Sequence, residues 1–318
     1  MSISTFNIKK WYRMLRGKSI LHVNQGLGRC FSTTDICGYY NDLTEKVTKM
    51  PELLNCDELP HVEDERGEQI LFPVAVFQYG LGAYDLYLLK HDERYLKKFY
   101  QCVCWAMQNQ ESSGAWNNFF FIYPRTPYGA MCQGEGTSLL IRAYKHSGNK
   151  IYLEAAQKAL DFMLISVTNG GTSDETEERL LLLEYTHRTA VLNGWIFALF
   201  GLYDAALVCD SRVYRDAFDK SLHTLIKSLH DFDCGYWSIY SRDGKIASPF
   251  YHDLHIAQMQ ALYAMTHNKL FLEYSERWTA YKKSFWKSKK AFVKKVFQKI
   301  DTKFENYEYI HGLKKAQK

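Results

Sequence analysis

From Phe72 onward, hydrophobic and polar positions recur with the period of an α-helix, and the same design appears four times. Each copy has a first helix rich in small and aromatic residues, then a short polar turn, then an amphipathic second helix. The four copies cover residues 78–110, 136–164, 193–229 and 256–285. This pattern predicts four consecutive helical hairpins.

The register of the repeat supports this prediction. An aromatic residue opens each expected second helix, at intervals of 57, 62 and 57 residues: Tyr95, Tyr152, Tyr214 and Phe271. The turns between the paired helices carry Asp, Asn, Gly or Ser, as short helix–helix connections require. Because one such hairpin cannot bury its apolar face alone, neighbouring hairpins must stack. The sequence therefore predicts a mainly all-α fold, an incomplete α/α toroid with first helices inside and second helices outside.

Two regions lack the helical period. Residues 19–70 mix glycine-rich and acidic pieces, and residues 233–250 alternate aromatics with Gly and Pro, which indicates a β-hairpin or ordered loop over one mouth of the toroid. We divide the chain into an N-terminal basic and irregular extension, a toroid that carries the chemistry and a basic amphipathic tail: 1–71, 72–284 and 285–318.

Composition and charge refine this picture. The chain has 318 residues, of which 47% are hydrophobic, and this excludes a disordered protein. The formal net charge of +5 is unevenly placed, because residues 1–18 carry +5, residues 282–300 carry +8 and residues 301–318 carry +1, which leaves about −9 for residues 19–281. In residues 285–300, aromatics alternate with lysines, as in helices that lie on anionic membranes. The alternative is a basic tail that packs its apolar side on its own domain.

Other features limit the location and the partners. We expect no membrane-spanning helix, since no apolar run approaches 18 residues, and no signal peptide. The eight cysteines form no CxxC pair, so we expect no zinc site and a reducing, cytoplasmic location, with the basic ends at the inner face of a membrane. No nucleic-acid-binding motif accompanies the basic ends, and nucleic acid is not an expected partner.

Polar and aromatic residues concentrate between the expected hairpins, where the loops of a toroid converge on one end. Aromatic rings that stack, together with Arg, Gln and Asn, suit a saccharide, which has apolar faces and hydroxyl edges. The candidates from this pattern are Gln78, Tyr79, Trp116, Arg125, Gln133, Glu135, Glu184, Tyr185, Tyr240, Arg242, Tyr251, His252 and His255.

Several candidates have a structural alternative. Tyr79 lies inside a first helix, where tyrosine is more often a core residue. Glu184 follows four hydrophobic residues and could be a paired carboxylate at the end of an element, and Glu135 could begin a helix. His252 and His255 are three residues apart, but no third metal ligand has a suitable spacing, and we predict no metal site.

The same segments carry a resemblance to a known family. They resemble the C-terminal domain of the D-glucuronyl C5-epimerases, the enzymes of heparin and heparan sulfate biosynthesis, over about residues 72–288. The resembling segments occur in the family's order: FPVAVFQYGL (72–81), NQESSGAW (109–116), MCQGEGTSLLIRAY (131–144), LNGWIFALFGLYD (192–204), WSIY (237–240), YHDLHIAQMQAL (251–262) and RWTAYKKS (277–284).

The resemblance implies removal of the proton at C5 of a uronate and return of a proton to the opposite face. It makes Glu184 and Tyr251 the base and the acid, with Tyr185 and Tyr240 assisting. Arg242 or His252 suits neutralisation of the substrate carboxylate as charge develops. Asn193, in the LNG segment, joins the expected substrate-binding residues. No GxGxxG fingerprint follows an expected strand, and we expect no cofactor.

Three other functions remain open. A polysaccharide lyase shares the proton abstraction and then expels the C4 substituent. A non-catalytic glycan-binding or assembly subunit would use the basic ends as an anchor. An α/α glycoside hydrolase would pair Glu184 with Glu135 or Asp253. The expected partners are a uronate-containing anionic polysaccharide and an anionic membrane surface reached through residues 285–300, and a homodimer is left open.

Overall fold

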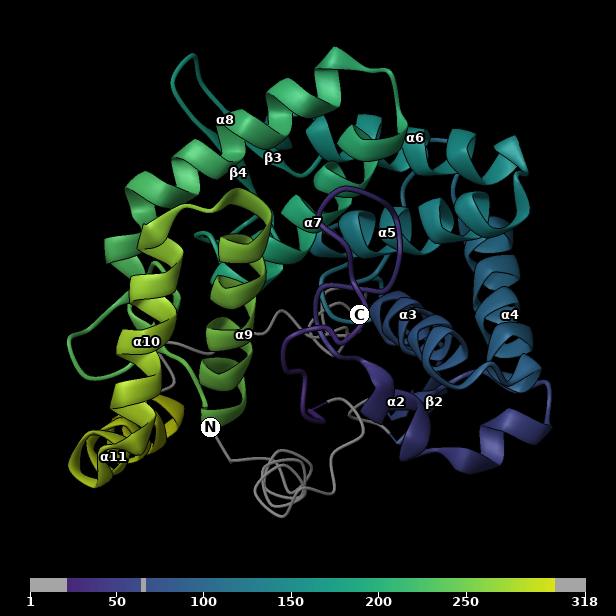
Figure 1. Ribbon diagram of the computed structural model, residues 1–318. Coiled ribbons are helices and arrows are strands. Elements are labelled where there is room, and N and C mark those ends of the chain that lie inside the picture. The colour runs from purple at the N-terminus through teal and green to yellow at the C-terminus, as the bar shows by residue number, and fades with distance from the viewer. Residues whose placement is uncertain (1–21, 64–66, 301–318) are drawn as a thin grey trace, which may run out of the picture.

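The computed structural model describes residues 22–63 and 67–300, and four antiparallel helical hairpins make up most of this part of the chain (Figure 1). The first helices form an inner arc in which α5 packs against both α3 and α7, and α7 packs against α9. The second helices cover the outside of the arc. The predicted mainly helical fold, an incomplete α/α toroid, is confirmed.

Each hairpin agrees with the repeat found in the sequence. The inner and outer helices pair as α3 (Pro73–Lys90) with α4 (Glu93–Asn109), α5 (Ala130–Ser147) with α6 (Lys150–Leu164), α7 (Leu192–Val208) with α8 (Arg212–Ser228), and α9 (Pro249–Thr266) with α10 (Lys269–Lys283). The aromatic residue that marked the register is the third residue of every outer helix. Tyr95, Tyr214 and Phe271 are buried there.

Local chemistry explains the tight turns. In three of the hairpins, the inner helix ends at a residue in the left-handed conformation, namely His91, Gly148 or His267. The next residue, Asp92, Asn149 or Asn268, accepts a hydrogen bond from a backbone N–H in the first turn of the outer helix. A left-handed C-cap followed at once by an Asx N-cap reverses the chain within two residues.

Three inner helices begin earlier than the sequence pattern predicted. Pro73 and Pro249 occupy the first turns of α3 and α9, where the missing N–H of proline has no cost. Glu135 and Tyr251 therefore lie within helices, so the prediction that they lie between hairpins is wrong, whereas Gln78 lies in the first hairpin as the repeat predicted. The small residues in MCQGEG hid the start of α5, because glycines weaken a helical pattern.

Short strands and turns connect the hairpins. Two of the β-hairpins lie near the site, and the one within 233–250 confirms the sequence prediction, whereas the one before α7 was missed. The remaining elements are α2 (Thr44–Thr48), the 3₁₀ helices η1 (Pro51–Asn55), η2 (Val167–Asn169) and η3 (Leu229–Phe232), and the pairs β1 (Val62–Glu63) with β2 (Gln69–Ile70), β3 (Ser173–Glu175) with β4 (Leu180–Leu182), and β5 (Ile239–Ser241) with β6 (Lys245–Ile246).

The segment that precedes α2 packs against the inner helices, far along them from their N-terminal ends. The Arg142 guanidinium on α5 donates to Asp204 Oδ2 on α7 at 2.7 Å and to the Gly38 carbonyl at 2.9 Å. Tyr40 Oη donates to Asp204 Oδ1 at 2.6 Å, and the Tyr39 amide donates to Asp85 at 2.8 Å. These bonds join the segment to three of the inner helices and cover one end of the arc.

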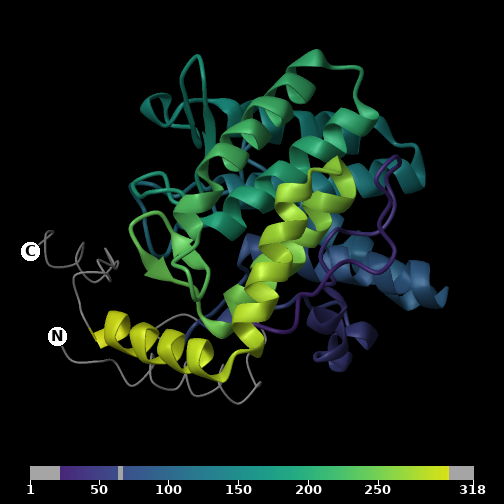
Figure 2. The same ribbon diagram turned by 60° about the vertical axis from the view of Figure 1, so that its left-hand side comes forward.

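The C-terminal part of the described chain is helix α11 (Phe285–Ile300), which extends from the body beside β6 (Figure 2). The predicted basic segment 1–18 and residues 301–318 of the tail lie outside the described residues. None of the helices within the described ranges combines the length and apolar content that crossing a bilayer requires. All eight cysteines are free thiols.

Candidate functional site

The candidate site lies at the N-terminal ends of the inner helices, opposite the end covered by Tyr39 and Tyr40. Glu184 and Tyr185 lie between β4 and α7, Tyr240 lies on β5, and Tyr251 lies in the first turn of α9. The β5–β6 hairpin is held against the segment before α7, since the Arg242 amide donates to the Ala190 carbonyl at 3.1 Å. Residues from three parts of the repeat therefore meet at one end of the arc.

Glu184 is a buried carboxylate with one unsatisfied oxygen. Its residue is 8% exposed, and Oε2 has no hydrogen-bond partner in the described part of the chain. The carboxylate lies against Gly194 in the first turn of α7, where an added Cβ would lie 2.3 Å from Oε2. Burial raises the pKa of Glu184 to about 7, although a hydrogen bond from Tyr185 and the charge of Arg188 oppose the rise.

The tyrosines connect to this carboxylate. The Tyr185 hydroxyl lies near enough to the carboxylate of Glu184 to lower its pKa, and Tyr240 lies near enough to Tyr185 and Glu184 for both to raise the pKa of its own hydroxyl. The rings of Tyr240 and Tyr251 are 4.7 Å apart between centroids. Burial raises the pKa of Tyr240, and the negative charge of Glu184 raises it further. The four residues predicted to be catalytic thus form one connected group.

A second buried carboxylate, Glu135, lies on α5. Its Oε1 accepts a hydrogen bond from Gln78 Nε2 at 2.7 Å, and its Oε2 has no such partner among the described residues. Burial raises the pKa of Glu135 to about 8, with a further contribution from Glu184. Burial also lowers the pKa of Lys46 on α2 to about 8, an effect that the charge of Glu135 opposes. Two carboxylates with raised pKa values therefore lie inside the arc.

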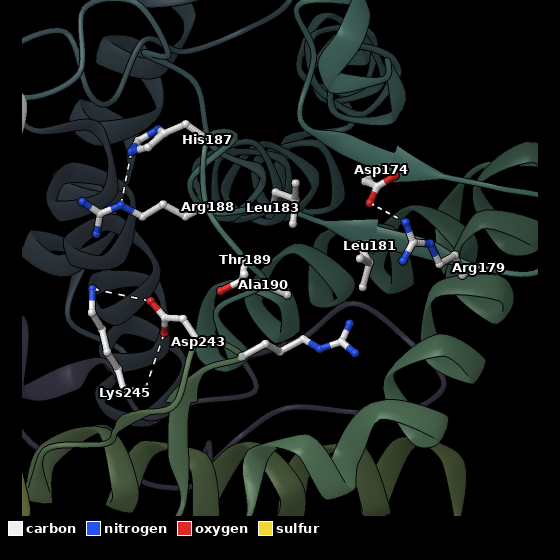
Figure 3. Close-up of a pocket in the computed structure, with 11 residues that line it drawn as sticks. Asp174, Arg179, Leu181, Leu183, His187, Arg188, Thr189, Ala190, Asp243 and Lys245 are labelled. Carbon is white, nitrogen blue, oxygen red and sulfur yellow. Dashed lines mark hydrogen bonds and ion pairs between the residues drawn. The ribbon is translucent and has the colours of Figure 1, made fainter. Parts of the chain in front are cut away.

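Beside this group opens a pocket of about 810 Å³ (Figure 3). Its walls come from the β3–β4 hairpin, from residues 187–190 and from the β5–β6 hairpin. Basic residues exceed acidic ones in the lining, which includes Arg179, Arg188, Arg242, Lys245 and His187 with Asp174 and Asp243. A groove of this charge favours an anionic ligand.

The arginines of the pocket have defined positions. Arg242 forms an ion pair with Asp231 at 2.6 Å, and its side chain remains one-third exposed. The Arg188 guanidinium lies over the rings of Tyr123 and Tyr185, at 5.3 and 5.4 Å from their centroids, and donates to Tyr123 Oη at 2.9 Å. Arg188 therefore connects the pocket to the tyrosine that lowers the pKa of Glu184.

Four other residues that the sequence predicted to bind substrate lie elsewhere, three of them in the core and one in an exposed loop. Tyr79 and Trp116 are fully buried, and Trp116 Nε1 donates to the Ala106 carbonyl at 2.8 Å. The Gln133 side chain accepts from the Trp116 amide and donates to its carbonyl, at 3.0 Å each. Arg125 lies exposed in the loop that precedes α5. The structure does not bring these four residues to the Glu184 group.

The two histidines of α9 lie in the core. His252 Nδ1 is 2.8 Å from Ser238 Oγ, its Nε2 is 3.0 Å from the Trp278 carbonyl, and its ring stacks on Trp237 at 3.6 Å. His255 shares Ser238 Oγ at 3.0 Å. Burial lowers the pKa of His252 to about 4 and lowers that of His255. At neutral pH neither carries the positive charge that neutralising a substrate carboxylate requires.

Asn193 begins α7 next to the Glu184 group. Its carbonyl accepts a hydrogen bond from Gln258 Nε2 on α9 at 3.2 Å, and its side-chain Oδ1 is buried with no partner in the described ranges. Sequence reasoning missed Gln258 and Lys46, and it also missed the pocket residues Arg179, Arg188 and Lys245. Only Arg188 had a usable signal, since it follows Glu184 by four residues. The described residues contain no group of three His, Cys, Asp or Glu that could hold a metal ion.

The fold and the site place this protein in a class of helical-hairpin proteins that have buried carboxylates and tyrosines beside a cation-lined pocket. The model of the family described as D-glucuronyl C5-epimerase C-terminus matches residues 104–280, more than half of the chain. The chain belongs to this family, and the resemblance found in the sequence is confirmed.

Individual proteins are also similar to this chain. The chain is 26% identical over 218 residues to a D-glucuronyl C5-epimerase of Caenorhabditis elegans, covering 59% of this chain and 35% of that protein. It is 28% identical over 156 residues to an uncharacterized protein, MJ1128, of Methanocaldococcus jannaschii, covering 47% and 51%. The chain thus spans between a third and half of these relatives. A solved structure titled polysaccharide lyase BACCELL_00875 aligns with a TM-score of 0.44 at 13% identity, covering 66% of this chain and 58% of that one.

Proposed function

We propose that this protein is a uronate 5-epimerase that acts on a uronate-containing polysaccharide and converts D-glucuronate residues to L-iduronate residues. The observation that carries the proposal is the connected group of Glu184, Tyr185 and Tyr240 beside the cation-lined pocket. Membership of the C5-epimerase family supports the same reaction.

The chemistry starts with the base. Glu184 takes the C5 proton, and the electron pair of the C–H bond moves into the carboxylate of the uronate, which becomes an enediolate. A carboxylate whose pKa is raised to about 7 is a stronger base than an ordinary glutamate and is still partly ionised at neutral pH. A proton delivered to the opposite face by the Tyr251 hydroxyl then completes the inversion. The proton on Glu184 returns to solvent, and the Tyr251 phenolate takes a proton from solvent, which restores both groups.

The developing charge on the substrate carboxylate needs a fixed cation. Arg242 fills this role in our proposal, because it lines the pocket and lies on the same hairpin as Tyr240. Arg188 is close enough to Glu184 to lower its pKa, and we assign it a supporting role. His252, the other cation suggested by the sequence, is left out because its pKa is lowered to about 4.

Exchange with heavy water tests the proposal directly. Incubation of a heparosan-type glucuronate polymer with the wild-type protein in deuterium oxide should place deuterium at C5 and yield iduronate, whereas Glu184→Gln and Tyr251→Phe should not exchange. Lys150→Glu, on the surface of α6, is the control and should exchange like the wild type. Unsaturated uronate in the product would identify a lyase, and absence of exchange on every uronate polymer would overturn the proposal.

A further inference from the structure

Helix α11 does not contact the body of the protein through its apolar face, as an ordinary amphipathic helix does. Ala291 and Gln298 are its buried residues, at 3% and 8% exposure. The Gln298 side chain accepts from the Ile246 amide at 2.9 Å and donates to the Gly244 carbonyl at 2.8 Å. Lys295 Nζ donates to the Ile246 carbonyl at 2.7 Å. A small and polar edge therefore faces the protein.

The apolar face of α11 points away from the body. Six of its large hydrophobic residues are between 41% and 80% exposed, and with 3.6 residues per turn they share a face of about 140°. They are Phe285, Trp286, Phe292, Val293, Val296 and Phe297. Amphipathic helices normally bury such a face, and a contiguous exposed patch of this kind marks an interaction surface. Packing of the apolar side on the domain, one of the two alternatives for this segment, does not occur.

Charge identifies the kind of partner. Residues 282–300 contain eight lysines and no acidic residue. Four of the lysines contact the rest of the protein: Lys295 through the bond above, Lys282 through an ion pair with Asp253 at 2.8 Å, and Lys287 and Lys290, which lie 4.1 Å from the ring centroids of Tyr281 and Tyr236. Lys289 and Lys294 are exposed on the free part of the helix. Large apolar side chains flanked by lysines match the boundary between acyl chains and anionic head groups.

A groove beside α11 supports the same partner. It has a volume of about 520 Å³, runs between α11 and the start of α9, and is lined mainly by apolar side chains that include Trp237, Pro249 and Phe292. The polar part of the lining is Ser288, Lys289 and the ion pair between Lys282 and Asp253, 2.8 Å apart. An apolar groove with the Lys289 ammonium group beside it suits a lipid acyl chain below an anionic head group.

We propose that α11 docks this protein on an anionic phospholipid bilayer through its exposed aromatic face. A second copy of the chain is disfavoured, because two α11 helices, each with a charge of +6, would repel each other. A nucleic acid would neutralise the lysines but leave the valines and phenylalanines in water. Since Gln298 and Lys295 hold β6, docking places the hairpin that carries Tyr240 and Arg242 next to the membrane (Figure 2).

Sedimentation of the full chain with sucrose-loaded vesicles tests the proposal. We expect binding to vesicles of phosphatidylcholine with about one-third phosphatidylglycerol, and binding at least about tenfold weaker to phosphatidylcholine alone. Trp286→Ser with Phe297→Ser should lower binding about tenfold or more. The matched control, Ile151→Ser with Val213→Ser, removes two residues that are 56% and 63% exposed on outer helices and should bind like the wild type.

A second pair of variants isolates charge. Lys289→Glu with Lys294→Glu should abolish the preference for anionic vesicles. Lys150→Glu with Lys269→Glu makes the same change in net charge at the first residues of α6 and α10 and should retain the preference. Unchanged binding by the first pair, or equal losses in both pairs, would overturn the proposal. So would a wild type that ignores vesicles and instead forms dimers, or binds single-stranded RNA, in a manner sensitive to Trp286→Ser with Phe297→Ser.

Discussion

The two ends of the inner helices each contain buried carboxylates, and their surroundings differ. At the end covered by the N-terminal segment, Asp204 has both oxygens bonded, one to Tyr40 Oη at 2.6 Å and one to Arg142 Nη1 at 2.7 Å. At the site end, Glu184 and Glu135 each keep one buried oxygen without a partner in the described residues. The covered end thus holds a fully bonded carboxylate in Asp204, and the site end holds two incompletely satisfied ones. Asp85, also at the covered end, accepts from the Tyr39 amide, and burial raises its pKa to about 7.

This difference separates stability from reactivity. A carboxylate bonded on both oxygens by a cation and a phenol is stabilised in its charged form, and it joins segments far apart in sequence. An unsatisfied buried carboxylate costs free energy of folding, and such groups persist where function requires them. The raised pKa values of Glu184 and Glu135 express that cost, since burial disfavours their charged forms.

The largest expected effect is on catalysis at Glu184. Glu184→Gln keeps the shape of the side chain but removes the base, and the rate of C5 exchange should fall by about 10²–10⁴-fold. The free energy of unfolding should stay equal or rise, because an unsatisfied buried charge is lost. Urea denaturation beside the exchange assay checks both parts. A variant that exchanges at the wild-type rate, or one that is strongly destabilised, would place Glu184 among the structural residues.

At the end covered by the N-terminal segment, we expect a substitution to lower stability. Arg142→Met leaves Asp204 buried without its cation, and the free energy of unfolding should fall by about 3–5 kcal/mol. Lys145→Met on the same helix is the matched control, because its ion pair with Asp35 is exposed, and it should leave the urea midpoint nearly unchanged. Equal midpoints for the two variants would show that the Arg142 network does not stabilise the fold.

Two glycines, Gly194 beside Glu184 and Gly80 on α3, allow a test for which we expect an effect of intermediate size. A Cβ at Gly194 would lie 2.3 Å from Glu184 Oε2, whereas a Cβ at Gly80 would lie 2.8 Å from Cys102 Cβ and Leu139 Cδ1. Both alanine variants should lose about 1–3 kcal/mol of stability through overpacking. Only Gly194→Ala should also slow C5 exchange, by about tenfold or more, since it displaces the base. Similar exchange rates per folded molecule in both variants would contradict this assignment.

The sequence predicted the parts of the fold that local chemistry determines. The Asp92, Asn149 and Asn268 caps follow directly from turn residues, and the helical period identified the inner and outer helices. Glu184, Tyr185, Tyr240 and Tyr251 were found because they fall between periodic segments. The start of α5 was missed because Gly134 and Gly136 are poor helix formers, and only packing against α7 and Trp116 explains them.

Contacts between distant segments were beyond the reach of the sequence. Tyr40 meets Asp204 across 164 positions, and no periodicity predicts that pairing. His252 looked like a cation next to a tyrosine, but its neutral state depends on burial between Trp237 and Trp278. The aromatic and lysine pattern of 285–300 was visible, whereas the edge that docks on the body was not, because it depends on the position of β6.

We expect the smallest effect from Glu135, and it should appear in how the free energy of unfolding depends on pH. The pKa of Glu135 is raised from 4.5 to about 8, so the folded protein binds more protons than the unfolded chain between these values. The free energy of unfolding contributed by Glu135 must therefore fall as pH rises through this window. In Glu135→Gln this decline is absent, so stability relative to the wild type should increase with pH, by at most about 1.4 kcal/mol per pH unit.

The comparison is best made between pH 6.5 and 8. His252, His255 and Asp85, whose pKa values burial shifts, act in both proteins and cancel in the difference. Because the charge of Glu184 raises the pKa of Glu135, loss of Glu135 lowers the pKa of Glu184 in return, and this adds a smaller change in the same direction. Lys46, which faces Glu135, adds in the same direction, because loss of the carboxylate lowers its pKa further and stability then rises with pH. Urea denaturation of both proteins across this range is the measurement. Parallel curves would mean that Glu135 is ionised throughout, and the contrast between the two ends would then rest on Glu184 alone.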